Sequence, residues 1–334
     1  MNYGKAVVCG GGGFIGGHLV ADLLSKGYKQ VRCVDVKPKD QWYQVHPKAE
    51  NIVADLNLKE KAFDAVKGMD VVYNLACNMG GMGFIENNKG LCMISVLINT
   101  HLLLAAREHG AKRFFYASSA CVYNGDKQKD KSTELFLKEE DAYPALPEDG
   151  YGWEKLFSER MCRHFREDWK TPTRMARFHN VYGPFGTWEG GREKAPAAIC
   201  RKVIEAKQSG KHEIEIWGDG KQTRSFMFIT DCLHGIHLIT DSDTFFEPIN
   251  LGSSEGVTIN TLVDIVEDIA GIKLKRNYNL NAPKGVNGRN SDNTLIQKVF
   301  NWEPNTKLRD GMEKTYKWIY DQYMSKYGKK LKSA

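Results

Sequence analysis

Short apolar runs alternate with amphipathic stretches through the first third of the chain. The runs have the length of buried strands, and the stretches between them repeat apolar positions with the period of a helix. We expect strands at 5–9, 30–34, 71–76 and 113–117, and helices at 14–24, 58–66 and 96–108. Parallel strands need a crossover helix between them. This order therefore predicts an α/β fold with a doubly wound parallel sheet.

A glycine-rich turn joins the first predicted strand to the first predicted helix. Gly10, Gly13 and Gly16 form a GxxGxxG pattern, and Phe14 and Ile15 open the helix. Glycines permit a tight turn and let backbone N–H groups approach a pyrophosphate at the helix N-terminus. A glycine-rich turn without a ligand has the same local pattern. The strand, loop, helix and second strand in this order favour the dinucleotide site of a Rossmann fold, which these five residues would form.

Further candidate cofactor residues follow the next strands. Asp35 ends the second run, where a carboxylate accepts hydrogen bonds from the adenosine ribose. It would repel a 2′-phosphate, so we expect NAD rather than NADP, although Lys37 weakens this preference. Asp55 is equally consistent with a cofactor contact and with a loop cap. Leu75, at the end of another strand, is expected to line the adenine and ribose.

Three residues predict proton-transfer chemistry. Tyr151 and Lys155 are spaced i, i+4 on a predicted helix, so their side chains share one face. A nearby cation favours phenolate over phenol. The same pair also occurs on many solvated helices. Ser119 follows the strand at 113–117, and we expect all three residues to meet at the carboxyl edge of the sheet, where doubly wound folds bind ligands.

The bulk composition limits the domain organisation and the class of protein only loosely. The chain of 334 residues, 42% hydrophobic, is long enough for a main domain and a smaller companion. We find no apolar run near the roughly 18 residues of a membrane span, and residues 1–5 lead directly into the first strand, so neither a membrane segment nor a signal peptide is expected. The net charge of +6 is spread along the chain, so it does not distinguish a nucleic-acid ligand from a small anionic ligand.

The eight cysteines form no CxxC pair and no metal-ligand spacing. We therefore expect no metal site, a reducing compartment and a cytoplasmic location.

Ser119, Tyr151 and Lys155, together with the glycine-rich NAD site, resemble the extended short-chain dehydrogenase/reductase superfamily. The resemblance extends over nearly the whole chain and is typical of the nucleotide-sugar epimerase/dehydratase branch, at 179–184, 217–220, 223–226 and 248–252. It implies that Tyr151 takes a hydroxyl proton while the carbinol hydride goes to the nicotinamide. Lys155 would hold the nicotinamide ribose and lower the pKa of Tyr151, and Ser119 would hydrogen-bond the reacting oxygen.

The residues after Ser119 separate members of this branch. Ala120 and Cys121 stand where 4,6-dehydratases of this scaffold carry Asp-Glu, so the elimination acid is missing. A thiol, with an unperturbed pKa of about 8.5, can abstract a proton from a carbon acidified by a ketone, and Lys194 can deliver one from the opposite face. Together with 78–85, 185–188 and 288–293, this pair closely resembles the GDP-mannose 3,5-epimerase family.

That resemblance implies a cycle that converts GDP-mannose to GDP-L-galactose: oxidation at C4, proton exchange at C3 and C5 by Cys121 and Lys194, and return of the hydride. The implied substrate site contains Gly80, Met82, Gly83, Ser119, Asn180, Lys194, Trp217, Arg224 and Arg289. The two arginines would grip the diphosphate. From the residues alone, a buried thiol is the favoured interpretation of Cys121, and core packing is at least as consistent with Trp217. Lys194 is equally a surface residue or a diphosphate ligand, and either arginine could form an interdomain ion pair.

Several alternatives stay open from the sequence. They are an epimerase acting at C3 or C5 alone, a C4 epimerase, a C4 dehydrogenase, and an NAD-binding regulatory or structural protein. The intact set of Ser119, Tyr151 and Lys155 argues against the last of these.

We expect an NAD-binding domain of residues 1–183 plus about 223–252, and a smaller discontinuous α/β substrate-binding domain of about 184–222 plus 253–334. The segments 223–240 and 248–252 are expected to return to the main sheet. The family resemblance also implies a homodimer formed through helices at 96–108 and 151–164, with no nucleic-acid or membrane partner.

Overall fold

A seven-stranded sheet forms one half of the computed structural model, which describes residues 4–129, 135–282 and 285–331. Its strand order is β11-β7-β5-β4-β1-β2-β3, and every pairing is parallel. The strands are β1 (Lys5–Cys9), β2 (Gln30–Asp35), β3 (Glu50–Val53), β4 (Val71–Asn74), β5 (Arg113–Ser119), β7 (Thr173–Phe178) and β11 (Ile249–Leu251). The order reverses between β1 and β4, which confirms the predicted doubly wound sheet.

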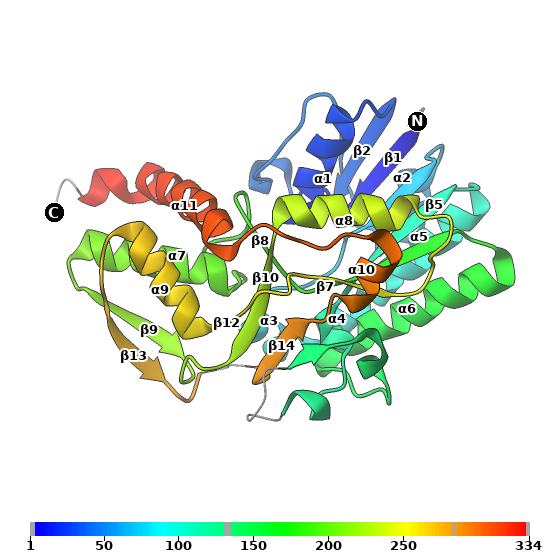
Figure 1. Cartoon of the computed structure of the whole chain (residues 1–334). Helices are drawn as coiled ribbons and strands as arrows, with labels where there is room; N and C mark the ends of the chain where they lie inside the picture. Colours follow the sequence, from blue (N-terminus) through cyan, green and yellow to red (C-terminus); the bar gives the residue numbers. More distant parts are fainter. Residues whose placement is uncertain (1–3, 130–134, 283–284, 332–334) are drawn as a thin grey trace.

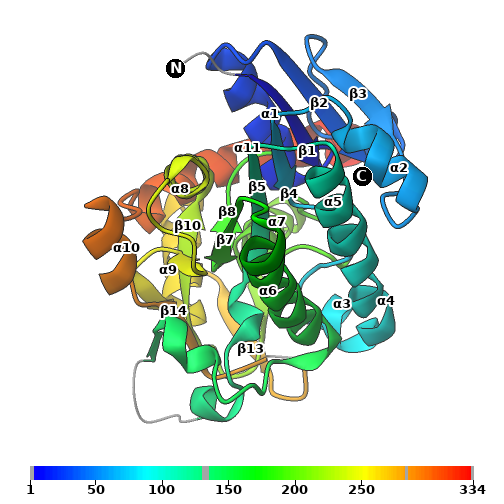
Figure 2. The same cartoon turned by 90° about the vertical axis from the view of Figure 1, so that its right-hand side faces the viewer.

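Helices cover both faces of this sheet (Figures 1 and 2). On one face α1 (Phe14–Ser25) packs beside α8 (Ile229–Asp241), and on the other lie α2 (Lys59–Val66), α5 (Val96–Glu108) and α6 (Asp149–Trp169). Strand β1 shows why both faces are apolar. Ala6 and Val8 belong to the core under α1, whereas Val7 and Cys9 belong to the core under α5. Burial on both faces makes β1 a continuous apolar run rather than an alternating one.

The second half is built around smaller sheets. A five-stranded sheet has the order β12-β10-β14-β6, with β8 also paired to β10, and β13 pairs with β9 in a separate ribbon. The strands are β6 (Phe136–Leu137), β8 (Asn180–Tyr182), β9 (Glu213–Trp217), β10 (Thr223–Phe228), β12 (Gly256–Thr258), β13 (Lys275–Asn279) and β14 (Gly288–Ser291). The remaining helices are α3 (Met82–Asn87), α4 (Lys89–Ile94), α7 (Ala195–Ser209), α9 (Ile259–Ala270), α10 (Thr294–Phe300) and α11 (Leu308–Leu331), and short 3₁₀ turns occur at Lys39–Gln41, Ala120–Val122, Asp126–Gln128 and Glu139–Ala142.

The chain returns to the main sheet only in part after β9. As expected, β11 pairs with β7, and α8 packs against β5 and β7. The expectation is wrong for β10, which lies in the five-stranded sheet between β12 and β14. The reason is that β11 occupies the place beside β7, so β10 pairs instead with β8, which continues the chain beyond β7.

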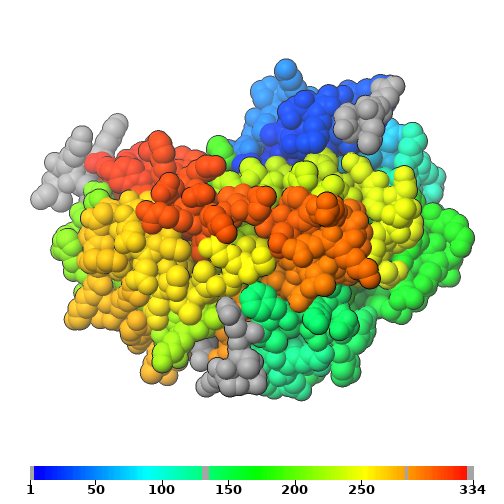
Figure 3. All heavy atoms as spheres, in the orientation of Figure 1, coloured from blue at the N-terminus to red at the C-terminus, as the bar shows by residue number. Residues whose placement is uncertain are grey.

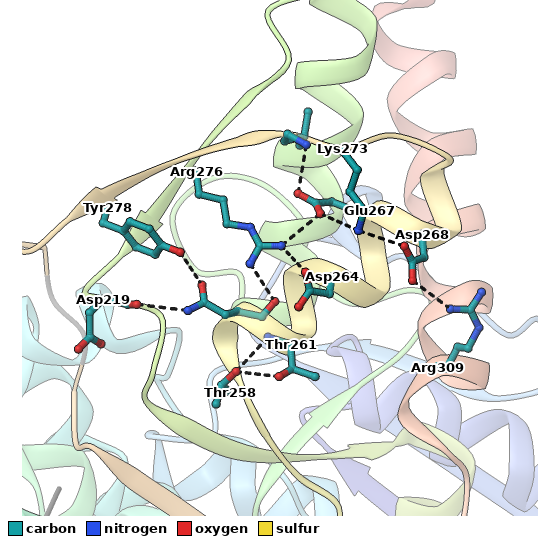
Figure 4. A network of polar contacts seen from close by, with 12 residues as sticks. Asp219, Thr258, Thr261, Asp264, Glu267, Asp268, Lys273, Arg276, Tyr278 and Arg309 are labelled. Atoms are coloured by element: carbon teal, nitrogen blue, oxygen red, sulfur yellow. Dashed lines mark hydrogen bonds and ion pairs between the residues drawn. The ribbon is translucent and has the colours of Figure 1, made fainter.

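Polar contacts fix the ribbon of β9 and β13 against α9 (Figure 4). Arg276 on β13 donates to Asp264 at 2.5 Å and to Glu267 at 3.2 Å, both on α9. The Tyr278 hydroxyl donates to Asn260 at 3.1 Å. These contacts hold the outer ribbon in one orientation relative to the helix.

The C-terminal segment, orange to red in the space-filling view, crosses one face of the molecule and joins its two halves (Figure 3). Helix α10 packs against β11 of the main sheet, and α11 packs against α7 and α9 of the second half.

The stretch Lys89–Glu108 is long and apolar enough to cross a membrane by length and composition, contrary to the sequence expectation. In the structure it is two helices that meet at Ser95, and 44% of its most apolar window is buried. Helix α5 packs against α2 and α6.

Candidate active site

A cavity of about 290 Å³ lies where the two halves of the molecule meet. Its walls come from the ends of β5 and β8, from α3, α6 and α7, and from β9, β10 and β14. The predicted catalytic and substrate residues that line it are Gly80, Met82, Gly83, Ser119, Cys121, Tyr151, Asn180, Lys194, Trp217, Arg224 and Arg289. Segments distant in sequence are therefore brought to one site.

Ser119 is the last residue of β5, and the chain turns sharply after it. Its Oγ accepts a hydrogen bond at 3.2 Å from the backbone N–H of Cys121, which fixes the 3₁₀ turn Ala120–Val122. The turn places the Cys121 thiol in the same cavity as the Ser119 hydroxyl. This is the local reason that the two side chains can serve one substrate.

Lys155 lies beneath the cavity wall rather than in it. Its Nζ donates to the carbonyl of Ala117 at 3.1 Å and lies 5.6 Å from the Tyr151 ring centroid. Burial alone would lower the pKa of Lys155, but Cys77 and the Glu154 carboxylate outweigh it and raise the pKa. Lys155 is therefore held as a cation beside Tyr151, as the i, i+4 spacing predicted.

Burial raises the pKa of Tyr151 well above its usual value, and Cys77 and Cys121 add to this effect. A hydrogen bond with Ser119 acts in the opposite direction. The buried phenol is therefore protonated in this state, and the expectation that Lys155 lowers the pKa of Tyr151 is wrong for this state, because burial dominates.

The Cys121 thiol contacts a buried arginine. Arg289 on β14 donates from Nη1 to Cys121 Sγ at 3.2 Å, from Nη2 to Glu148 at 2.5 Å and from Nε to Gln128 at 2.8 Å. Arg289 is 6% exposed. The guanidinium is thus fixed by two side chains and offers its remaining edge to the sulfur. Arg289 thus directs an N–H donor at the sulfur to which the family resemblance assigns the role of base.

Arg224 and Arg289 are direct partners in the β10–β14 pairing. Burial and the charge of Arg289 lower the pKa of Arg224 to about 10. Arg224 donates to the carbonyls of Thr223 and Val286, each at 2.7 Å. Two adjacent guanidinium groups suit a dianionic ligand. For Arg289 the contacts of the described structure are those of the ion-pair alternative, and its diphosphate contact stays a prediction.

Lys194 approaches the cavity from the N-terminal end of α7. Burial lowers its pKa, and Cys121 is the largest opposing influence. A lysine with a lowered pKa gives up its proton more readily than an exposed one. Cys121 and Lys194 are therefore close enough to influence each other's charge, on walls contributed by different halves of the molecule.

The glycine turn fits a bound dinucleotide. Gly10 has φ +84°, and a Cβ on it would lie 2.9 Å from the backbone nitrogen of Ala76. A Cβ on Gly16 would lie 2.2 Å from the Gly10 carbonyl. Gly13 caps α1, and Phe14 and Ile15 form its first turn. The backbone N–H groups at this helix terminus face the position that a pyrophosphate takes in such folds.

Asp35 lies at the end of β2, 7% exposed. Its Oδ1 accepts from the backbone N–H of Lys37 at 3.0 Å, and the Lys37 side chain donates to the Gly12 carbonyl at 3.0 Å. Asp55 Oδ1 accepts from the Asn57 backbone and side chain, which is the loop-cap role. Leu75 follows β4 beside β1. Contact of these residues with a cofactor stays a prediction.

Other cavity residues were missed from the sequence. Lys202 lies two turns after Lys194 on α7, so helical periodicity would have placed both on one face. Glu215 lies two residues before Trp217, on the same face of β9. Gln128 and Glu148 had no such signal, because only the folded chain brings them to Arg289.

Comparisons with known proteins show a family and relatives whose described activities are consistent with the residues of this site. Residues 6–252 match the model of the family described as "NAD dependent epimerase/dehydratase family". The chain is 46% identical to GDP-mannose 3,5-epimerase 1 of Oryza sativa subsp. japonica, over 94% of this chain and 81% of that protein. It is 45% identical to GDP-mannose 3,5-epimerase of Arabidopsis thaliana, over 95% of this chain and 82% of that protein.

The fold is shared more widely. The UDP-glucose 4-epimerase of Thermotoga maritima, solved with UDP-glucose, superposes with a TM-score of 0.83 at 21% identity, over 95% of this chain and 99% of that one. The chain belongs to the NAD dependent epimerase/dehydratase family and, within it, to the GDP-mannose 3,5-epimerase group. The resemblance, the enzyme class and the NAD cofactor predicted from the sequence are confirmed.

Proposed function

We propose that this family member converts GDP-mannose to GDP-L-galactose by inverting C3 and C5 of the sugar. The observation that carries the proposal is that residues for two different reaction types line the same cavity. Ser119 and Tyr151 suit oxidation of a carbinol, while Cys121 and Lys194 suit proton exchange at carbon. The two relatives described above are named as GDP-mannose 3,5-epimerases.

The oxidation begins at the C4 hydroxyl. Ser119 hydrogen-bonds the oxygen, and Tyr151 takes the proton as the phenolate, which the Lys155 ammonium 5.6 Å from its ring centroid stabilises. Gly10, Gly13 and Gly16 would hold NAD, which when bound would supply reversible hydride acceptance at C4. The C4 ketone acidifies the hydrogens on C3 and C5, since the carbanion formed there is an enolate.

Proton exchange then uses the two walls of the cavity. The Cys121 thiolate takes a proton from the carbon, and the Lys194 ammonium delivers one to its opposite face. The contact with Arg289 fixes the Cys121 sulfur in the cavity, and the lowered pKa of Lys194 favours proton release. Both groups regain their starting protonation by exchange with water, so a solvent proton is left on the sugar.

The test is incubation of the holoenzyme with GDP-mannose in heavy water, followed by NMR. Deuterium at C3 and C5 together with the L-galactose configuration is the expected result. Product without carbon-bound deuterium would mean a C4 epimerase and would contradict the proposal. Deuterium at only one of these carbons would mean that the protein inverts a single centre.

The protein is also proposed to be a homodimer. Apolar side chains are exposed side by side on packed helices α4, α5 and α6, namely Leu91, Met93, Ile94, Leu97, Trp153 and Phe157. Exposed apolar side chains gathered on neighbouring helices are typical of an interaction surface. Sedimentation should give a dimer that Phe157→Asp dissociates and Leu280→Asp, on a 70% exposed side chain elsewhere, leaves intact. A dimer unaffected by Phe157→Asp would exclude this face.

A further inference from the structure

The end of the cavity formed by β9 carries a carboxylate, although the proposed ligand is an anion. Glu215 and Trp217 point to the same face of β9 and line the cavity with Lys202 of α7. The Trp217 Nε1–H donates to Glu215 Oε1 at 2.9 Å. The indole is 42% exposed. An exposed aromatic face is thus fixed in orientation by the neighbouring carboxylate.

Two carboxylates line the cavity, and they differ in their partners. Glu193 uses both oxygens within the protein, accepting from Arg201 at 3.1 Å and from the Gly191 backbone at 2.7 Å. In the described parts of the chain, Glu215 Oε2 has a single hydrogen-bond partner, the Asn279 side chain at 3.5 Å. Glu215 therefore keeps capacity to accept strong hydrogen bonds from a ligand.

Glu215 lies on a different wall of the cavity from the two arginines. Lys202 Nζ lies 3.9 Å from Oε1 and donates to the Glu215 backbone carbonyl at 2.9 Å, so the negative charge of Glu215 is partly compensated. Arg224 and Arg289 occupy the β10–β14 wall. A diphosphate at the arginines would leave the opposite end of the nucleotide, the base, beside Glu215 and Trp217.

A carboxylate discriminates between bases by their hydrogen-bonding edges. Guanine presents two adjacent donors, N1–H and the N2 amino group, which match two carboxylate oxygens. Uracil presents one donor between two carbonyls, and adenine and cytosine each place an acceptor beside their amino group. Only guanine therefore pairs with a carboxylate without opposing a lone pair to it. Stacking on an aromatic ring adds affinity that does not depend on the base.

The ribbon that carries these residues is rigid enough for such recognition. Strand β9 pairs along its whole length with β13, from Lys275 opposite Glu213 to Asn279 opposite Trp217. Strand β13 is in turn fixed to α9 by the Arg276 and Tyr278 contacts drawn in Figure 4. A side chain on a fixed strand holds its position better than one on a loop.

We propose that Glu215 selects the guanine base of the nucleotide sugar through its N1–H and N2 amino group, with Trp217 as the stacking surface. The inference rests on the proposed function and names the residue that decides between GDP and other nucleoside diphosphates.

The test compares binding of GDP, IDP and UDP to the NAD-loaded enzyme by calorimetry. Inosine lacks the N2 amino group and uracil lacks the paired donors. Wild-type protein should bind GDP about tenfold more tightly than IDP, the loss expected for one hydrogen bond to a charged group. Glu215→Gln replaces one acceptor by an amino group, so its GDP affinity should fall and its preference for GDP over IDP should disappear.

Glu213→Gln is the matched control, because Glu213 is exposed two residues earlier on the same face and does not line the cavity. It should keep the wild-type preference. An unchanged GDP to IDP ratio in Glu215→Gln, or a wild-type preference for UDP, would overturn the proposal. Turnover of GDP-mannose by wild-type protein in heavy water is measured separately. Failure of base selection by Glu215 can therefore be distinguished from absence of the proposed epimerase activity.

Discussion

Arg289 donates a hydrogen bond to the Cys121 thiol at 3.2 Å, across 168 positions of the sequence. The contact joins β14 of the second half to the turn after β5 of the main sheet. It makes the base of the proposed epimerisation depend on both halves of the molecule being in place.

Removing Arg289 should affect stability as well as catalysis. Arg289→Ala leaves Glu148 without its ion-pair partner, and breaking such a buried pair costs about 3 kcal/mol of unfolding free energy. We also expect a higher KM for GDP-mannose and slower deuterium entry. Urea unfolding of Arg289→Ala and of Arg289→Met/Glu148→Met checks the ion pair, because the double variant should recover part of the loss. An unchanged KM would exclude the diphosphate contact.

Cys121→Ala should separate the two chemistries of the site. Oxidation at C4 uses Ser119 and Tyr151, so reduced cofactor should still form and absorb near its usual wavelength. Deuterium entry into the sugar should fall by about 10²–10⁴-fold, the usual contribution of general acid–base catalysis. Deuterium entry at the wild-type rate would return Cys121 to the role of a buried thiol.

Tyr151→Phe should abolish turnover while NAD stays bound. The ring is retained, so the packing around its buried position is preserved, and only the proton acceptor is lost. Fluorescence titration with NAD and an NMR assay of product check the two halves of this prediction. Full activity in the variant would remove the oxidation step from the mechanism.

Asp35→Ser should reduce the preference for NAD over NADP. The substitution removes the carboxylate that would repel a 2′-phosphate, and Lys37 then remains beside the glycine turn as a cation. Binding constants for both cofactors give the ratio, with Asp40→Ser as an exposed control nearby. Equal selectivity in Asp35→Ser and wild-type protein would contradict the assignment of Asp35.

Stability should fall on acidification because of a buried neutral histidine. Burial lowers the pKa of His179 to about 4, whereas an unfolded histidine titrates near 6.5. Between these values the unfolded chain binds more protons, so unfolding free energy falls as pH falls through this window. At pH 5 the loss from His179 is about 2 kcal/mol relative to pH 7.

His179→Gln should remove that part of the pH dependence while keeping a donor toward Asn250. Urea midpoints of both proteins at pH 7 and pH 5 measure it. Parallel losses in the two proteins would show that His179 is not the group that titrates.

The sequence by itself determined the Rossmann half of the fold and the chemistry of Ser119, Tyr151 and Lys155. These are local consequences of periodicity: apolar runs buried on two faces, a glycine turn that tolerates no Cβ, and a helical spacing that puts two side chains on one face. The helix predicted at 96–108 has the same bounds in the structure for this reason.

Tertiary structure alone decided the partners of Arg289 and the sheet that β10 joins. The physical reason is sequence separation. Gln128, Glu148 and Arg289 have no periodic relation to one another, and their polar side chains come into contact only in the folded chain. Pairing energies of that kind depend on distance and burial in the folded chain, which no spacing along the sequence encodes.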